Sequence, residues 1–276
     1  RLALGAVALA RAAGARAVEL IDRHVLELTR GHPGQAANRF WIEGDPEAVL
    51  IIELPAGADG QPLAARLRRA GAHAVAEVEG DAAARVWSLR RAGLGLLMGR
   101  AGARKPVTGI EDTAVPVERL PEYIEAVDRV VAGEGTACVH YGSVGLGLVH
   151  LRPFLDLSSA DDRVRYGRLL DAIAGLVHEF GGVWSTKHGD GRLRAPWLPG
   201  IMGADWIAAM RAVKELYDPS GLFNPGKILD APDPLSDLRA TAVRVRAPAG
   251  GGLDWRGDGD LAAAAGRCHG AGVCRR

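Results

Sequence analysis

The chain has 276 residues, which is enough for one large domain or two small ones. Its 34 basic and 33 acidic side chains give a net charge of +1, so the chain lacks the excess of basic residues that is typical of proteins that bind nucleic acid. No apolar run reaches membrane-spanning length, and no membrane span is expected.

The first residues and the cysteines also narrow the class of protein. The Ala-rich opening is interrupted by charges such as Arg11 and Arg16, unlike a signal peptide, and there is no starting Met, so a fragment is expected. Three cysteines do not make a disulfide framework, so the protein is expected in the reducing cytoplasm. Cys138 is expected to be a small buried hydrophobe on a strand.

The first third of the chain predicts alternating strands and helices. Residues 2–28 are mostly compatible with a helix broken at Gly14, although 15–21 also fits a short strand. The elements expected next are a buried strand at 48–54, a helix at 63–70 after Pro62, a strand at 73–78, and a helix through Arg91 that Asp81 caps. This order favours a split βαβ unit on an antiparallel or mixed sheet.

The remaining elements follow the same patterns of apolar spacing. They are an extended segment at 107–117, a helix at 121–131, strands at 136–141 and 147–151 joined by a Gly-rich turn, a helix from Ser158 or Ser159 to Phe180, and a helix at 204–217. Proline and glycine accumulate after Leu229 and indicate a linker.

Two segments that contain candidate functional residues precede residue 155. Arg90 and Lys105 could bind a carboxylate, but taken alone they are more typical of solvated surface cations. The run HYGSVGLGLVHLRP, at 140–153, needs a tight turn or a close approach of the backbone to a ligand. Its glycine spacing is not that of a dinucleotide fingerprint, and a plain hairpin turn explains it as well.

Two more segments follow. GGVWSTKHGDG, at 181–191, places Lys187 and His188 in a Gly-rich loop, where a neutral imidazole could accept a proton from a substrate hydroxyl. A solvated surface histidine is the plainer interpretation. DPSGLFNPGKI, at 218–228, lacks the glycine spacing of a P-loop and by itself indicates only a turn.

Together, four segments resemble the C-terminal domain of the FAD-linked oxidases related to glycolate oxidase, D-lactate dehydrogenase and D-2-hydroxyglutarate dehydrogenase. They are KPVTGIEDTAVPVERLPEYI, HLRPFLDL, GGVWSTKHGDG and DPSGLFNPGKIL. The resemblance implies an α+β fold, an antiparallel sheet covered by helices with ferredoxin-like elements, that caps a flavin. It implies this domain over 1–230, and the Pro- and Gly-rich linker spans 231–267. The ending CHGAGVC, at 268–274, resembles the start of the iron–sulfur domain that is fused to one bacterial branch of the family, so 268–276 is expected to be its truncated start.

The resemblance also implies roles. His188 matches the base that accepts the hydroxyl proton while hydride passes to flavin N5, and Lys187 is assigned to catalysis beside it. Arg90 and Lys105 match ligands of the substrate carboxylate, with His150 also assigned to substrate binding. The tail residues Asn224 and Lys227 match the motif that reaches the flavin. FAD would be held mainly by a domain absent from this chain, supplied by a flavin-binding domain or subunit.

The metal site of the family is altered. It uses two histidines seven residues apart and a Glu before the catalytic His, and this chain has Ser143 and Lys187 at two of those three places. His140 could stand in only if the turn were rebuilt. We therefore predict no divalent metal, and a zinc-binding module is disfavoured.

Two functional hypotheses remain. The first is the substrate-facing part of an FAD-dependent dehydrogenase of a small 2-hydroxy acid, in which Lys187 replaces the charge of the metal and electrons pass to an iron–sulfur acceptor. The second is a non-catalytic or degenerate cap domain that pairs with a separate flavin-domain chain. Leu148, which stands where the family often has a polar residue, favours this second hypothesis. Cys268 and Cys274 supply two of the four thiolates of a 4Fe–4S cluster, which residues beyond Arg276 would have to complete.

Overall fold

The computed structural model describes residues 2–100, 102–236, 238, 254–258 and 260–266. Its strands are β1 (Ala17–Asp22), β2 (Ala48–Glu53), β3 (Lys105–Pro106), β4 (Thr113–Ala114), β5 (Cys138–Gly142) and β6 (Leu148–Leu155). Its helices are α1 (Leu2–Ala12), α2 (Arg23–Arg30), α3 (Gln61–Arg69), α4 (Gly80–Met98), α5 (Leu120–Gly133), α6 (Ala160–Glu179), α7 (Leu198–Met202), α8 (Ala204–Tyr217) and α9 (Leu261–Gly266).

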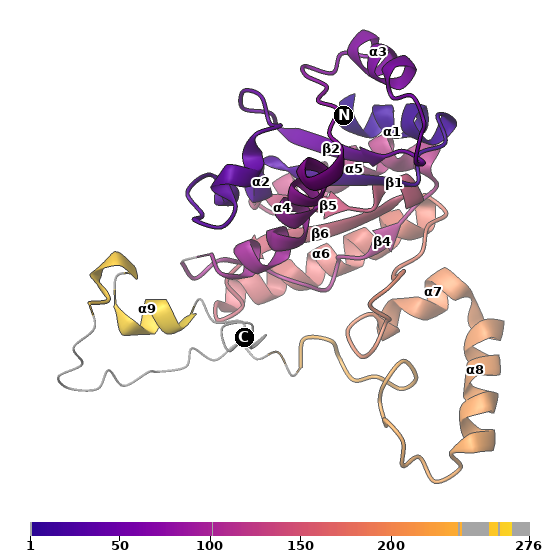
Figure 1. The fold of residues 1–276 in the computed structure, drawn as a ribbon. Helices are drawn as coiled ribbons and strands as arrows, with labels where there is room; N and C mark the ends of the chain where they lie inside the picture. The colour runs from indigo at the N-terminus through magenta and orange to yellow at the C-terminus, as the bar shows by residue number, and fades with distance from the viewer. Residues whose placement is uncertain (1, 101, 237, 239–253, 259, 267–276) are drawn as a thin grey trace.

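The strands form an antiparallel sheet in the order β2-β1-β5-β6-β3, with β4 also paired to β6. Helices α1, α5 and α6 pack one face, and α2 and α4 pack the other, so each face has its own apolar cluster. Figure 1 shows α7 and α8 set apart from this sheet. The expected α+β class, an antiparallel sheet covered by helices, is confirmed.

Strand β6 passes through the centre of the molecule and all eight of its residues are buried. Val149 and Leu151 belong to the cluster under α5 and α6, whereas Phe154 belongs to the cluster under α4. Because side chains alternate along a strand, His150 and Arg152 share the face of Phe154. The same strand therefore supplies the apolar core on one face and polar groups on the other.

Several expected elements form as predicted, and the strand expected at 73–78 does not. The short-strand alternative for 15–21 is correct, and Ser159 caps α6 by accepting from the backbone N–H of Asp162. Residues 73–78 form no strand, so the split βαβ unit predicted from them is wrong. The segment is mostly exposed, and side chains from α3 hold it, with Arg68 donating to the carbonyl of Val75 and Gln61 to Glu77.

Other boundaries shift modestly. The N-cap position of helix α4 is Glu79, whose side chain makes no capping hydrogen bond, whereas Asp81 lies in the first turn, and the helix continues to Met98. Only Thr113–Ala114 of the extended segment 107–117 is in a strand, because Asp112 has a φ of 72° and turns the chain before it. Cys138 is buried in the core, as expected. No helix in the described part of the chain is long and apolar enough to cross a membrane.

The tight turn between β5 and β6 requires glycine at position 147. Gly147 has a φ of 75°, and a Cβ there would collide with the carbonyl oxygen of Val115. We expect Gly147→Ala to lower the free energy of unfolding by at least about 2 kcal/mol. Gly95→Ala, in α4 with open space around it, is the matched control and should be neutral or stabilising by up to about 1 kcal/mol. Equal denaturation midpoints for the two variants would contradict this account.

Candidate active site

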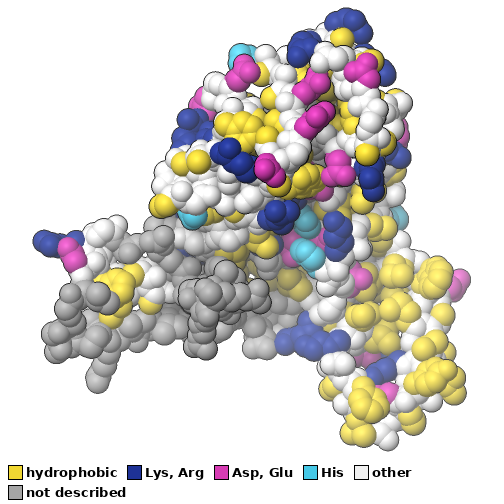
Figure 2. Space-filling model, in the orientation of Figure 1, with side chains coloured by type: hydrophobic (Ala, Val, Ile, Leu, Met, Phe, Trp, Pro, Cys, Tyr) yellow, Lys and Arg dark blue, Asp and Glu magenta, His cyan; other side chains and the backbone are white. Residues whose placement is uncertain are grey.

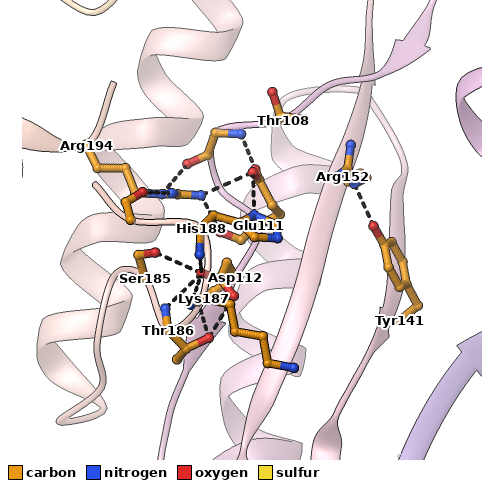
Figure 3. A network of polar contacts seen from close by, with 12 residues as sticks. Thr108, Glu111, Asp112, Tyr141, Arg152, Ser185, Thr186, Lys187, His188 and Arg194 are labelled. Atoms are coloured by element: carbon orange, nitrogen blue, oxygen red, sulfur yellow. Dashed lines mark hydrogen bonds and ion pairs between the residues drawn. The ribbon is translucent and has the colours of Figure 1, made fainter. Parts of the chain in front are cut away.

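Three segments that are distant in sequence meet on one face of β6, the face that carries His150 and Arg152 (Figure 3). They are β6 itself, the segment 109–114 that ends in β4, and the loop that contains KHGDG. Strand β4 pairs with β6 through Thr113 and Val149, which places Asp112 next to His150. The far side of β4 contacts the segment that leads into the KHGDG loop, through a bridge between Ala114 and Val183. Trp184, 2% exposed, anchors the start of that loop in the core.

Asp112 holds the loop in place. One oxygen of its buried carboxylate accepts from the backbone N–H groups of Thr186, Lys187 and His188, at 2.8, 2.6 and 2.8 Å, and from the Ser185 hydroxyl. The other oxygen accepts from the Thr186 hydroxyl. Burial alone would raise the pKa of Asp112, but these donors outweigh it and hold the pKa far below its usual range. Asp112 is therefore an anion that fixes the backbone of the loop.

Glu111 is the second buried carboxylate. It accepts from the backbone N–H of Gly109, and its Oε1 lies 3.2 Å from the guanidinium of Arg194, which is 4% exposed. Burial raises the pKa of Glu111, but Gly109 and Arg194 outweigh that effect and lower it. Arg194 also donates to the carbonyls of Gly109, Gly189 and Glu111, so it joins the two sides of the site.

His188 lies between these carboxylates and His150. Its Nδ1 is 3.2 Å from Oε1 of Glu111, and its side chain is 41% exposed. Its ring stacks on that of His150, with centroids 5.2 Å apart and planes 10° apart. Burial and the neighbouring His188 lower the pKa of His150 to about 4, so His150 is neutral near pH 7.

Lys187 and Arg90 lie around this centre. The Nζ of Lys187 donates to the hydroxyl of Ser143 at 3.2 Å. Arg90 binds one oxygen of Glu19 through two nitrogens, at 3.0 and 2.7 Å, and lies over the ring of Tyr141. The fork expected to bind a substrate carboxylate is thus paired with a carboxylate of the chain itself.

The other predicted site residues lie farther out. Lys105 pairs with Leu155 at the opposite end of β6, five residues from His150, or roughly 16 Å along the strand, and it donates to the carbonyl of Arg100. The tail returns to the site, because the backbone N–H of Ile228 donates to the carbonyl of Gly191 at 2.9 Å. Lys227 precedes that contact, and Asn224 adopts a φ of 48° in the same turn.

The residues present do not suit the metal site of the family. Asp112, His150 and His188 offer ligand atoms within 4.8 Å of one another. However, both oxygens of Asp112 already accept hydrogen bonds from the loop, and the ammonium of Lys187 would repel a cation. His140 lies opposite Leu151 in the ladder and therefore faces away from His150, with its Nε2 3.0 Å from Asp128.

Helix α8 and the segment after it form an apolar surface beside the site. They enclose a groove of about 570 Å³ whose lining includes Trp206, Val213, Tyr217, Phe223 and Lys227. Figure 2 shows hydrophobic side chains gathered over this part of the molecule, and histidines next to basic residues in the middle of the same face. Trp206 is 63% exposed and Tyr217 is 79% exposed.

Comparison with known proteins defines the class. Residues 2–228 match the family described as "FAD linked oxidases, C-terminal domain", and the chain belongs to this family. The fold is also similar to that of a solved structure, the 4-ethylphenol oxidase from Gulosibacter chungangensis in its isoeugenol complex. That chain matches with a TM-score of 0.50 and 16% identity, over 77% of this chain and 47% of its own length.

Several relatives of the chain are named for 2-hydroxy acids. D-2-hydroxyglutarate dehydrogenase of Escherichia coli K12 is 32% identical over 69% of this chain and 18% of its own length. The enzyme of the same name from Pantoea ananatis is 29% identical over 95% of this chain and 27% of its own. Glycolate oxidase subunit GlcD of Bacillus subtilis is 30% identical over 45% of this chain and 26% of its own. The chain thus spans about a fifth to a quarter of the length of these relatives.

Sequence reasoning missed four residues of the site. Glu111 and Asp112 stand inside a segment that carries only the family resemblance. Arg194 was assigned no role, and neither was Arg152, whose Nε donates to the hydroxyl of Tyr141 at 2.9 Å. One signal was available for the acids, since GIEDTAV sets two consecutive carboxylates among apolar residues. Acids that are buried in this way need a partner, and a partner found there marks an ordered polar network.

Proposed function

We propose that this chain is the substrate-facing, C-terminal part of an FAD-dependent dehydrogenase that oxidises a small 2-hydroxy acid. The observation that carries the proposal is the placement of His188. Its backbone is fixed by Asp112 and its Nδ1 is engaged by Glu111, while the side chain stays 41% exposed. A partly open imidazole in a rigid loop is suited to accept the proton of a substrate hydroxyl.

The neighbouring residues divide the remaining work. Lys187, whose Nζ donates to the hydroxyl of Ser143, offers an ammonium for a substrate oxyanion or carboxylate. Nδ1 of His150 is buried and lacks a hydrogen-bond partner within the described residues. Arg90 could contact a substrate carboxylate if it exchanged Glu19 for it, whereas the position of Lys105 at the other end of β6 does not favour contact with the same substrate.

FAD would be held mainly by a separate flavin-binding domain or subunit and would take up the hydride. Asn224 and Lys227 fit a supporting role there, because their turn is hydrogen-bonded to the KHGDG loop through Ile228 and Gly191. No step in this proposal passes through a metal. Cys268 and Cys274, from which an iron–sulfur partner was expected, lie outside the described residues, and that electron acceptor stays a prediction.

A non-catalytic cap domain that pairs with a flavin-domain chain is the second candidate. The pairing of Arg90 with Glu19 favours it, since a substrate carboxylate would have to displace an internal one. The replacement of two family metal ligands, at Ser143 and Lys187, favours it as well.

Co-expression with the flavin domain of a relative tests the two candidates. The purified, FAD-loaded complex would be mixed with a panel of 2-hydroxy acids without oxygen, and the loss of flavin absorbance would be followed. Bleaching by at least one acid is expected if the chain is part of a dehydrogenase. A stable complex that no 2-hydroxy acid bleaches would reject the enzyme proposal and favour the cap domain.

A further inference from the structure

The contact between His188 and Glu111 determines which ring nitrogen can act. Glu111 has a side chain that is 7% exposed, and its two oxygens are satisfied by the N–H of Gly109, by Arg194 and by the imidazole. The loop that carries His188 is thus held by Asp112, and the carboxylate that meets its ring is held by Arg194.

An ionised carboxylate can only accept hydrogen bonds. The low pKa of Glu111, which follows from Gly109 and Arg194 despite burial, keeps it ionised near neutral pH. The proton in the 3.2 Å contact must therefore be on Nδ1 of His188. A neutral imidazole with a proton on Nδ1 has its lone pair on Nε2.

We infer that Glu111 is the positioning residue of this site, and that it holds His188 in the tautomer whose Nε2 accepts a proton. The role in catalysis rests on the proposed function, whereas the tautomer itself does not. The logic is that of any base that is oriented by a third group, in which a buried carboxylate fixes the ring and stabilises the imidazolium that forms. His150 does not oppose the charge, since it is stacked on His188 as a neutral ring.

Arg194 completes the arrangement. Its guanidinium binds the Glu111 carboxylate and three backbone carbonyls, and it is nearly fully buried. It therefore offsets the charge of Glu111 without reaching the exposed side of His188. The result is a chain of contacts from Arg194 through Glu111 to His188, in which only the last member reaches solvent.

Nitrogen NMR of the whole chain with 15N-labelled histidine tests the inference without flavin or substrate. His188 signals are assigned by their loss in His188→Gln. In the wild-type chain, at a pH at which the imidazole is neutral, the expected pattern is a protonated Nδ1 and an unprotonated Nε2. In Glu111→Ala, this pattern should be lost in favour of a proton on Nε2, the form that free imidazole side chains prefer.

The matched control is Asp190→Ala, which removes a carboxylate two residues from His188 and should leave the His188 pattern unchanged. A proton on Nε2 in the wild-type chain would overturn the inference, even if Glu111→Ala failed to fold. An unchanged pattern in a folded Glu111→Ala would overturn it too. Where flavin is bleached, Glu111→Ala should lower kcat more than it changes KM. If the tautomer is found but no acid bleaches the flavin, the proposed function fails and the structural inference stands.

Discussion

Replacing His188 by alanine in the flavin-loaded complex is expected to slow flavin reduction by a 2-hydroxy acid by about 10²–10⁴-fold. The reason is that the substrate hydroxyl would lose the group that takes its proton as hydride leaves the neighbouring carbon. Substrate binding should weaken much less, because Lys187 and His150 remain. The measurement is anaerobic stopped-flow spectroscopy over a range of substrate concentrations, which separates binding from the reduction step.

The control is His178→Ala, which removes an exposed histidine on α6 and should not change the rate. Thermal melting of both variants would show that the fold survives. A His188→Ala complex that bleached at the wild-type rate would remove His188 as the base and, with it, the observation on which the proposed function rests.

The double variant Ser143→His/Lys187→Glu should acquire a zinc site. The Nζ of Lys187 already lies 3.2 Å from the Ser143 hydroxyl, so side chains at these two positions meet, and His150 is on the adjacent strand. The change would recreate the two histidines and the Glu of the family pattern and would replace a repelling cation by an anion. After dialysis against zinc-free buffer, we expect about one zinc ion per chain, measured by elemental analysis.

The controls for this site are built into the same set of variants. Each single variant leaves one ligand fewer and should retain much less zinc, and adding His150→Ala to the double variant should abolish binding. The wild-type chain should retain none. Stoichiometric zinc in the wild-type chain that disappeared on His150→Ala would contradict both this prediction and the assignment of Lys187 as the replacement for a metal.

Part of the fold could be predicted from local patterns. Residues 204–217 have helical apolar spacing and end at Asp-Pro, and α8 has these bounds. The strand expected at 73–78 had the correct alternation but no partner strand, and alternation alone cannot reveal whether a sheet edge is within reach. The strand at 15–21 was ambiguous for the same reason, and its pairing with β2 and β5 decided it.

The site was predictable only where a residue acts through its own chemistry. His188 and Lys187 stand out because a Gly-rich loop exposes them. Asp112 acts through backbone N–H groups some seventy residues further along the chain, and no local pattern encodes such a contact. The partner of Arg90 was equally hidden, since Glu19 belongs to β1 and lies 71 residues earlier in the chain. The sequence thus indicates the reactive groups, and the structure adds the groups that hold them.

The alternation along β6 couples the chemistry of this protein to its folding. A slip of one residue in the pairing of β6 would turn His150 and Arg152 into the apolar layer under α5 and α6, and Val149 and Leu151 towards the site. Such a misregistered state would bury a charged guanidinium without its partners and is strongly disfavoured. Every folded chain therefore has His150 on the same side of β6 as His188. A chain with the wrong strand register stays unfolded, and no folded but inactive form accumulates.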